Sequence, residues 1–127
     1  MYYSRFTGMA PGARYGQIDL EGRIESASPH GLIAILFEEL GVSITLVAGC
    51  RNPQLQSQAL SRALNILQSL DGSLDFERGG AVAQTLSRVY AQTRALMLAG
   101  VREGAPEKIE QAGAIIAEIA ESWKQIG

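Results

Sequence analysis

The fold is decided by residues 28–49, which read SPHGLIAILFEELGVSITLVAG. Ser28 can accept hydrogen bonds from the first amides of a helix, and Pro29 suits the first helical position because its missing N–H has no intrahelical partner there. Gly49 can end the same helix. We therefore predict a helix from Pro29 to about Ala48. Its buried face consists of apolar residues at helical spacing, namely Ile33, Leu36, Phe37, Leu40, Ile44 and Val47.

Two further helices show similar start and stop signals. Asn52 can cap a second helix that opens with Pro53 and ends within LDGSLD, residues 70–75. A third helix is predicted over residues 80–102, with Gly104 as its stop. The predicted buried faces are Leu60, Ala63, Leu64, Leu67 and Leu70 in the second helix, and Val82, Leu86, Val89, Thr93, Leu96 and Met97 in the third.

A fourth helix is predicted from Pro106 onwards. Glu107 places a negative charge in its first turn, where it interacts favourably with the helix dipole. The predicted buried face is Ile109, Ala112, Ile116, Ile119 or Ala120, and Trp123.

These signals predict an all-α protein. The helices are roughly 18 to 25 residues long with short connections and no strand pattern, which favours an antiparallel up-and-down four-helix bundle. We expect one helical domain over residues 1–127, in which 28–127 form the bundle. Residues 1–14 contain glycine and proline without apolar periodicity and are expected to be a mobile tail, and residues 15–25 an arm or a short helix.

The composition excludes several classes of function. The chain has 127 residues, a net charge of -2, and only two lysines among its 11 basic residues, so no basic patch for nucleic acid is expected. The single Cys50 excludes an internal disulfide, and the single His30 leaves no zinc-ligand spacing. The N-terminus has no apolar segment of signal-peptide length, and Glu38 and Glu39 interrupt the apolar run of the first helix. We expect a cytosolic protein that does not insert into a membrane.

No catalytic, cofactor or metal site is predicted. An enzyme would need a nucleophile with a base, paired carboxylates in a cleft, or a metal-ligand set, and none is visible. His30 is interpreted as an exposed first-turn residue and Cys50 as a small packing residue. The Gly79–Gly80 pair follows a leucine-rich helix and lacks the Lys-Ser or Lys-Thr of a phosphate loop, so we interpret it as a tight start to the third helix.

The first helix lacks the polar outer face that a bundle helix needs. Between Pro29 and Cys50 its only charges are Glu38 and Glu39. One interpretation is that this helix is central and covered by the N-terminal arm. The other is that it forms a groove for a second amphipathic helix or a second copy of the chain. A second apolar stripe adjoins the buried one and consists of Leu32, Ile35, Val42 and Leu46.

Four segments are informative when taken together, namely YGQI at 15–18, SASPHGLIAILF at 26–37, LDFERGGAVAQTLSRVY at 74–90 and IAESWKQ at 119–125. In this order and spacing they resemble the flagellin-export chaperone family, the FliS-type proteins of bacterial flagellar assembly. The similarity covers about residues 15–123. Glu38 and Glu39 stand where that family commonly has Asp-Gly.

This resemblance implies a helical bundle that binds the C-terminal segment of newly made flagellin in the cytosol. Such a protein keeps flagellin from polymerising and hands it to the membrane export gate of the flagellar type III system, without catalysis or a cofactor. The family's tyrosine-bearing N-terminal segment, here Tyr15 and Ile18, is thought to cover the client groove. We therefore predict six partner-binding residues: Leu32, Ile35, Val42 and Leu46 on the client-facing stripe, and Tyr15 and Ile18 as its displaceable cover. A homodimeric helical scaffold or adaptor that uses the same stripe is the alternative.

Overall fold

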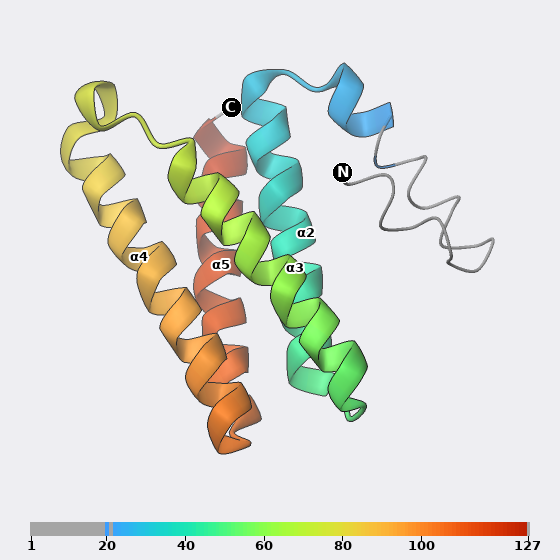
Figure 1. The fold of residues 1–127 in the computed structure, drawn as a ribbon. Helices are drawn as coiled ribbons and strands as arrows, with labels where there is room; N and C mark the ends of the chain where they lie inside the picture. The colour runs from blue at the N-terminus through green and yellow to red at the C-terminus, as the bar shows by residue number, and fades with distance from the viewer. Residues whose placement is uncertain (1–19, 21, 127) are drawn as a thin grey trace. The chain divides into compact units, whose positions relative to one another are not determined.

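The computed structural model describes residue 20 and residues 22–126, which are helical apart from short connections (Figure 1). The long helices are α2 (Pro29–Gly49), α3 (Pro53–Gly72), α4 (Phe76–Glu103) and α5 (Pro106–Ile126). Residues 22–26 are also helical, so the described part of the predicted arm is a short helix. No strand occurs in the described part of the chain, and the all-α class is confirmed.

The chain divides into two compact units, Met1–Ile35 and Leu36–Gly127, and α2 begins in the first and ends in the second. In the first unit, the Ser28 hydroxyl accepts a hydrogen bond from the Gly31 amide at 3.1 Å, which confirms the predicted cap. Tyr15, Ile18 and the predicted tail lie outside the described residues.

Polar caps and glycines set the helix ends. Asn52 Oδ1 accepts from the amides of Gln54 and Leu55 at 2.9 and 3.2 Å, so the predicted start of α3 is confirmed. Gly104 ends α4 in the left-handed conformation, with φ of 63°, and the Ala105 amide donates to Gly100 O at 2.8 Å. A residue with a Cβ would be strained at Gly104.

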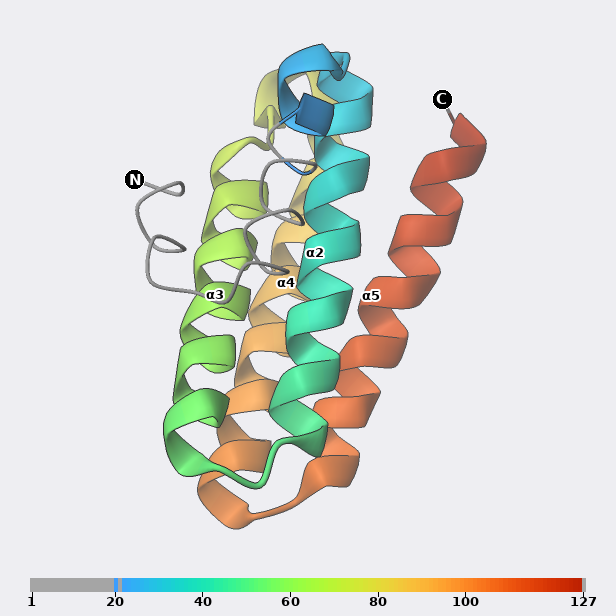
Figure 2. The same ribbon diagram turned by 90° about the vertical axis from the view of Figure 1, so that its right-hand side faces the viewer.

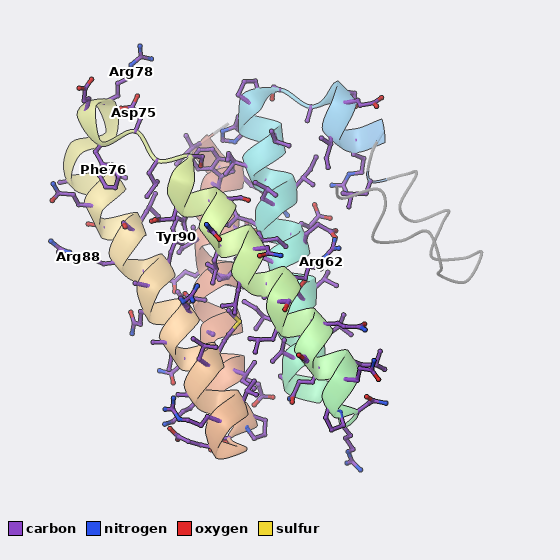
Figure 3. All side chains as sticks on the ribbon, in the orientation of Figure 1. Arg62, Asp75, Phe76, Arg78, Arg88 and Tyr90 are labelled. Carbon is purple, nitrogen blue, oxygen red and sulfur yellow. The ribbon has the colours of Figure 1, made fainter. Side chains whose placement is uncertain are left out.

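The predicted start of α4 at Gly80 is wrong. The helix begins at Phe76, because the Asp75 carboxylate accepts from the amides of Glu77 and Arg78, each at 3.1 Å (Figure 3). Gly80 then interrupts the helix after its first turn, with φ of 50° and ψ of -123°. The glycine pair therefore acts one turn inside the helix, as a kink that only a residue without a Cβ adopts easily.

Side chains from all four helices form the core of the second unit. Two predicted faces need correction. Val82 is 68% exposed, and Ala83 is buried in its place, because the Gly80 kink changes the register with which α4 meets its neighbours. In α3, Ile66 is buried while Leu60 and Leu64 are only half-buried. The largest fully buried apolar side chains are Leu40, Ile44, Val47, Leu70, Met97, Ile109 and Ile116.

Contacts join successive helices of this unit. The Gln56 side-chain amide of α3 donates to Val47 O of α2 at 2.9 Å, and Arg62 of α3 pairs with Glu39 of α2 at 2.7 Å. Ser87 of α4 donates to Asp71 of α3 at 2.9 Å. Helices α4 and α5 pack together, and Figures 1 and 2 show the helices of this unit side by side. The antiparallel four-helix bundle stays a prediction, which these contacts support.

Helix α2 is long and apolar enough to cross a membrane by length and composition, with a mean hydropathy of 1.9 in its most apolar window. The two glutamates therefore do not lower its hydropathy as far as the sequence interpretation assumed. A single helix of this kind is weak evidence for a membrane span, because a core helix passes the same test. Glu39 is partly buried and paired with Arg62, which explains how this charge is accommodated on α2.

Candidate partner-binding groove

A mainly apolar groove of about 1000 Å³ lies between α2 and α5. Its lining runs from Phe37 to Gly49 on α2 and from Glu110 to Lys124 on α5, all within the second unit. Figure 2 shows these two helices side by side. At 1.5 Å per residue, the lined parts of both helices are about 20 Å long, enough to accommodate roughly four turns of another helix.

Small residues form much of the groove lining. A Cβ added to Gly41 would meet no atom within 4 Å, so the space above it is open. A Cβ added to Gly113 would lie 3.3 Å from Ile44 Cγ2, so this glycine lets α5 approach α2 closely. Small residues allow the backbone of a neighbouring helix to approach. The small residues of the lining are Gly41, Ala48 and Gly49 on α2, and Gly113, Ala114, Ala117 and Ala120 on α5.

The exposed side chains of Val42 and Leu46 form an apolar edge of this groove. Each is 55% exposed, and their spacing of four residues places them on one face of α2. Single exposed apolar residues are common, but two neighbours beside a groove form a surface typical of protein interaction sites. Leu55, Phe76 and Val82 are similarly exposed but do not line this groove.

An aromatic contact joins α2 and α5. The rings of Phe37 and Trp123 pack edge to face, with centroids 6.3 Å apart and planes at 65°. This geometry is favourable for aromatic pairs. Trp123, which the sequence placed on the buried face of its helix, is half-buried.

The structure brings together two of the six predicted partner-binding residues. Val42 and Leu46 line the groove. Leu32 is half-buried and Ile35 is 6% exposed, and neither belongs to the lining. Ile35 is therefore a buried residue in this structure and not part of an open surface. Tyr15 and Ile18 lie outside the described residues.

Sequence reasoning did not identify the α5 wall of the groove, although it placed Ile116, and Ala120 as an alternative to Ile119, on the buried face. Gly113, Ala117 and Ala120 are spaced by four and three residues, which places them on one helix face. This stripe of small residues adjoins the buried stripe of α5 and was a usable signal. It was overlooked because small residues contribute little to a search for large apolar side chains.

A smaller cavity of about 230 Å³ lies between α3 and α4 and is lined in part by Asp71, Ser87, Tyr90 and Arg94. Tyr90, labelled in Figure 3, is 5% exposed. Burial, and secondarily the negative charge of Asp71, raise the pKa of Tyr90 to about 12. This cavity is too small for a helix.

The described residues contain no group of three or more His, Cys, Asp or Glu side chains that could hold a metal ion. The Cys50 thiol is half-buried and donates to Asn52 O at 3.5 Å. Within the part of the chain that the structure describes, the groove between α2 and α5 is the strongest candidate for function.

Comparison with known proteins identifies the family. The model of the family described as flagellar protein FliS matches residues 11–127. The chain belongs to the FliS family. The flagellar secretion chaperone FliS of Salmonella typhimurium is 37% identical over 117 residues, which cover 88% of this chain and 86% of that protein. FliS of Escherichia coli is 33% identical over 118 residues, covering 87% of this chain and 85% of its own length. FliSB of Pseudomonas aeruginosa is 25% identical over 119 residues, covering 89% of this chain and 92% of its own length.

Membership of the FliS family confirms the resemblance on which the sequence interpretation relied. The family match includes residues 11–19, which lie outside the described structure, and all of the groove. The relatives are named as flagellar secretion chaperones, which fits an apolar binding groove better than a catalytic centre.

Proposed function

We propose that this protein is a cytosolic chaperone that binds the C-terminal segment of flagellin in the groove between α2 and α5. It keeps flagellin unassembled and passes it to the export gate of the flagellar type III apparatus, without catalysis, a cofactor or membrane insertion. The framework is an antiparallel four-helix bundle. Tyr15 and Ile18 cover the apolar stripe of Leu32, Ile35, Val42 and Leu46 until the client displaces them.

The observation that carries the proposal is the exposure of Val42 and Leu46 beside a groove lined with small residues. A disordered client segment loses conformational entropy when it folds on a surface, so a long apolar contact must offset that loss. Full burial of one Val or Leu side chain contributes about 1.5–3 kcal/mol. The two exposed side chains and the small-residue lining together supply such a contact.

The direct test is titration of the protein with a peptide from the C-terminal end of the flagellin encoded in the same genome. We expect a 1:1 complex by calorimetry and a gain of helicity by circular dichroism. Absence of binding at tens of micromolar would contradict the proposal, because it means a binding free energy weaker than about -6 kcal/mol.

Two matched variants locate the binding site. Leu46→Glu places a charge at the edge of the groove and should weaken binding at least tenfold, by about 1.4 kcal/mol. Val82→Glu makes a comparable substitution at a position that is 68% exposed and outside the groove, so it should leave affinity unchanged. Equal effects of both variants would place the client elsewhere.

The alternative function is a homodimeric scaffold that buries the same exposed pair against a second copy. Sedimentation at several concentrations separates the two functions. A stable dimer that dissociates in the Val42→Glu variant, together with no flagellin binding, would favour the scaffold. A client-free dimer that the flagellin peptide dissociates would remain compatible with the chaperone.

A further inference from the structure

The charged side chains of the groove are mostly acidic. The lining contains three carboxylates, from Glu38, Glu110 and Glu121, and one cation, Lys124. Glu110 and Glu121 are exposed, and neither forms an ion pair with another residue of the described part of the chain. An apolar groove with unpaired carboxylates on its rim is electrostatically complementary to a basic partner.

The two α5 carboxylates have a defined spacing. Glu110 and Glu121 are eleven residues apart, which is about three helical turns, so they lie on the same face of α5 and about 16 Å apart along its axis. A helix that lies along the groove can place basic residues opposite both carboxylates only if those residues are also about three turns apart.

The small-residue lining restricts the shape of the occupant. Nothing lies within 4 Å of a Cβ placed on Gly41, so an approaching helix can come close to α2 there. The exposed side chains of Val42 and Leu46 offer an apolar edge to one side, and the carboxylates of α5 lie on the other wall. This arrangement suits an amphipathic helix with an apolar stripe and a basic flank.

We infer that the groove selects a helix of about four turns with two basic residues spaced by eleven positions, which pair with Glu110 and Glu121. The inference rests on the proposed use of the groove for client binding. Lys124 lies three residues from Glu121, a spacing that places both on the same side of α5, whereas no cation of the lining has such a spacing from Glu110. Glu110 therefore contributes more to binding than Glu121.

The test uses three labelled 16-residue helical peptides with the same apolar stripe, measured by fluorescence anisotropy. The first has lysines at positions i and i+11, the second has glutamates at those positions, and the third has its lysines at i and i+5, which lie on different faces. At about 50 mM salt we expect the first peptide to bind roughly tenfold more tightly than the other two. This difference in affinity should become smaller at about 1 M salt, where the Debye length falls to about 3 Å.

Three single variants assign the effect to the rim. Glu110→Gln should weaken binding of the first peptide about fivefold and Glu121→Gln about twofold, since each exposed ion pair is worth little by itself. Glu118→Gln is the matched control, because Glu118 is exposed on α5 but does not line the groove. Its affinity should equal that of the unmodified protein.

The outcomes separate this inference from the proposed function. Equal binding of the first two peptides, or equal effects of Glu110→Gln and Glu118→Gln, overturns the charge inference, and so does a failure of all three peptides to bind. If the flagellin peptide still binds and remains sensitive to Leu46→Glu, the groove retains its proposed function. If Leu46→Glu affects neither the flagellin peptide nor the first designed peptide, the proposed function fails as well.

Discussion

Helix α5 meets α4 and α2 in different ways. Towards α4, a Cβ placed on Gly100 would lie 2.5 Å from Ile109 Cγ1 and 3.0 Å from Ala105 O, so the contact is closed. Towards α2, Gly113 allows one close approach to Ile44, and beyond it an open groove of about 1000 Å³ remains. One helix thus has a closely packed face towards α4 and borders an open groove towards α2.

The two contacts of α5 differ because they bury different amounts of apolar surface. Met97 and Ile109 are at most 2% exposed, and each contributes about 1.5–3 kcal/mol to folding. Val42 and Leu46 keep 55% of their surface in contact with solvent, so that part of their burial energy remains available to a partner.

The largest expected effect comes from disrupting the closed interface. Gly100→Val should lower the free energy of unfolding by about 3 kcal/mol, because the new side chain overlaps Ile109 and the Ala105 carbonyl. The measurement is the urea midpoint with an unchanged m-value. Gly72→Val is the control, since a Cβ there meets no atom within 4 Å. A similar loss in both variants would show that the close contact at Gly100 is not responsible.

The second prediction concerns Tyr90, which lies between α3 and α4. Its pKa is raised from 10.0 to about 12, so the unfolded chain releases this proton at lower pH than the folded chain does. The stabilisation is complete below pH 10 and is lost between pH 10 and 12, by about 2 kcal/mol. Denaturation experiments over this pH range measure the free energy of unfolding. This free energy should fall more steeply with pH in the unmodified protein than in the Tyr90→Phe variant. Parallel curves would contradict the raised pKa.

The third prediction separates stability from binding on the open side. Gly41→Ala should raise the free energy of unfolding by up to about 1 kcal/mol, because Gly41 lies inside α2 and has space for a methyl group. The same methyl group enters the groove and should weaken flagellin-peptide binding severalfold. Gly72→Ala, outside the groove, should leave the affinity unchanged. Unaltered affinity in Gly41→Ala would mean that no helix approaches this position.

The smallest expected effect is at Ser43. Its side chain is 1% exposed, and its hydroxyl has no hydrogen-bond partner among the described residues. Ser43→Ala removes an unsatisfied polar group and should raise stability by roughly 0.5 kcal/mol. Thr93 is the matched comparison, because its buried hydroxyl donates to Val89 O at 2.9 Å. Thr93→Val should therefore lower stability slightly, and a loss in both variants would indicate a partner for Ser43.

Helix ends were predictable where a local signal decides them. Asn52 caps α3, Ser28 caps α2 and Gly104 ends α4, because each needs only hydrogen bonds or a backbone conformation within a few residues. The start of α4 was misplaced because the Asp75 cap stabilises a turn before the glycine pair, which by itself suggested a boundary.

Buried faces were predicted less reliably than helix ends. The α5 face of Ile109, Ala112 and Ile116 is confirmed. On α4, helical periodicity favoured Val82 over Ala83, but the Gly80 kink changed which residue faces the core. Periodicity assumes a regular helix and therefore does not follow a break inside it.

The sequence alone determined that the chain is all-helical, and it showed an apolar stripe on residues 28–49 without a polar outer face. Only the tertiary structure decided that Ile35 is buried while Val42 and Leu46 stay exposed, and that α5 supplies the second wall of the groove. The physical reason is that helical spacing assigns residues to faces of one helix. Which face is covered depends on the neighbouring helices and on how closely their small residues let them approach.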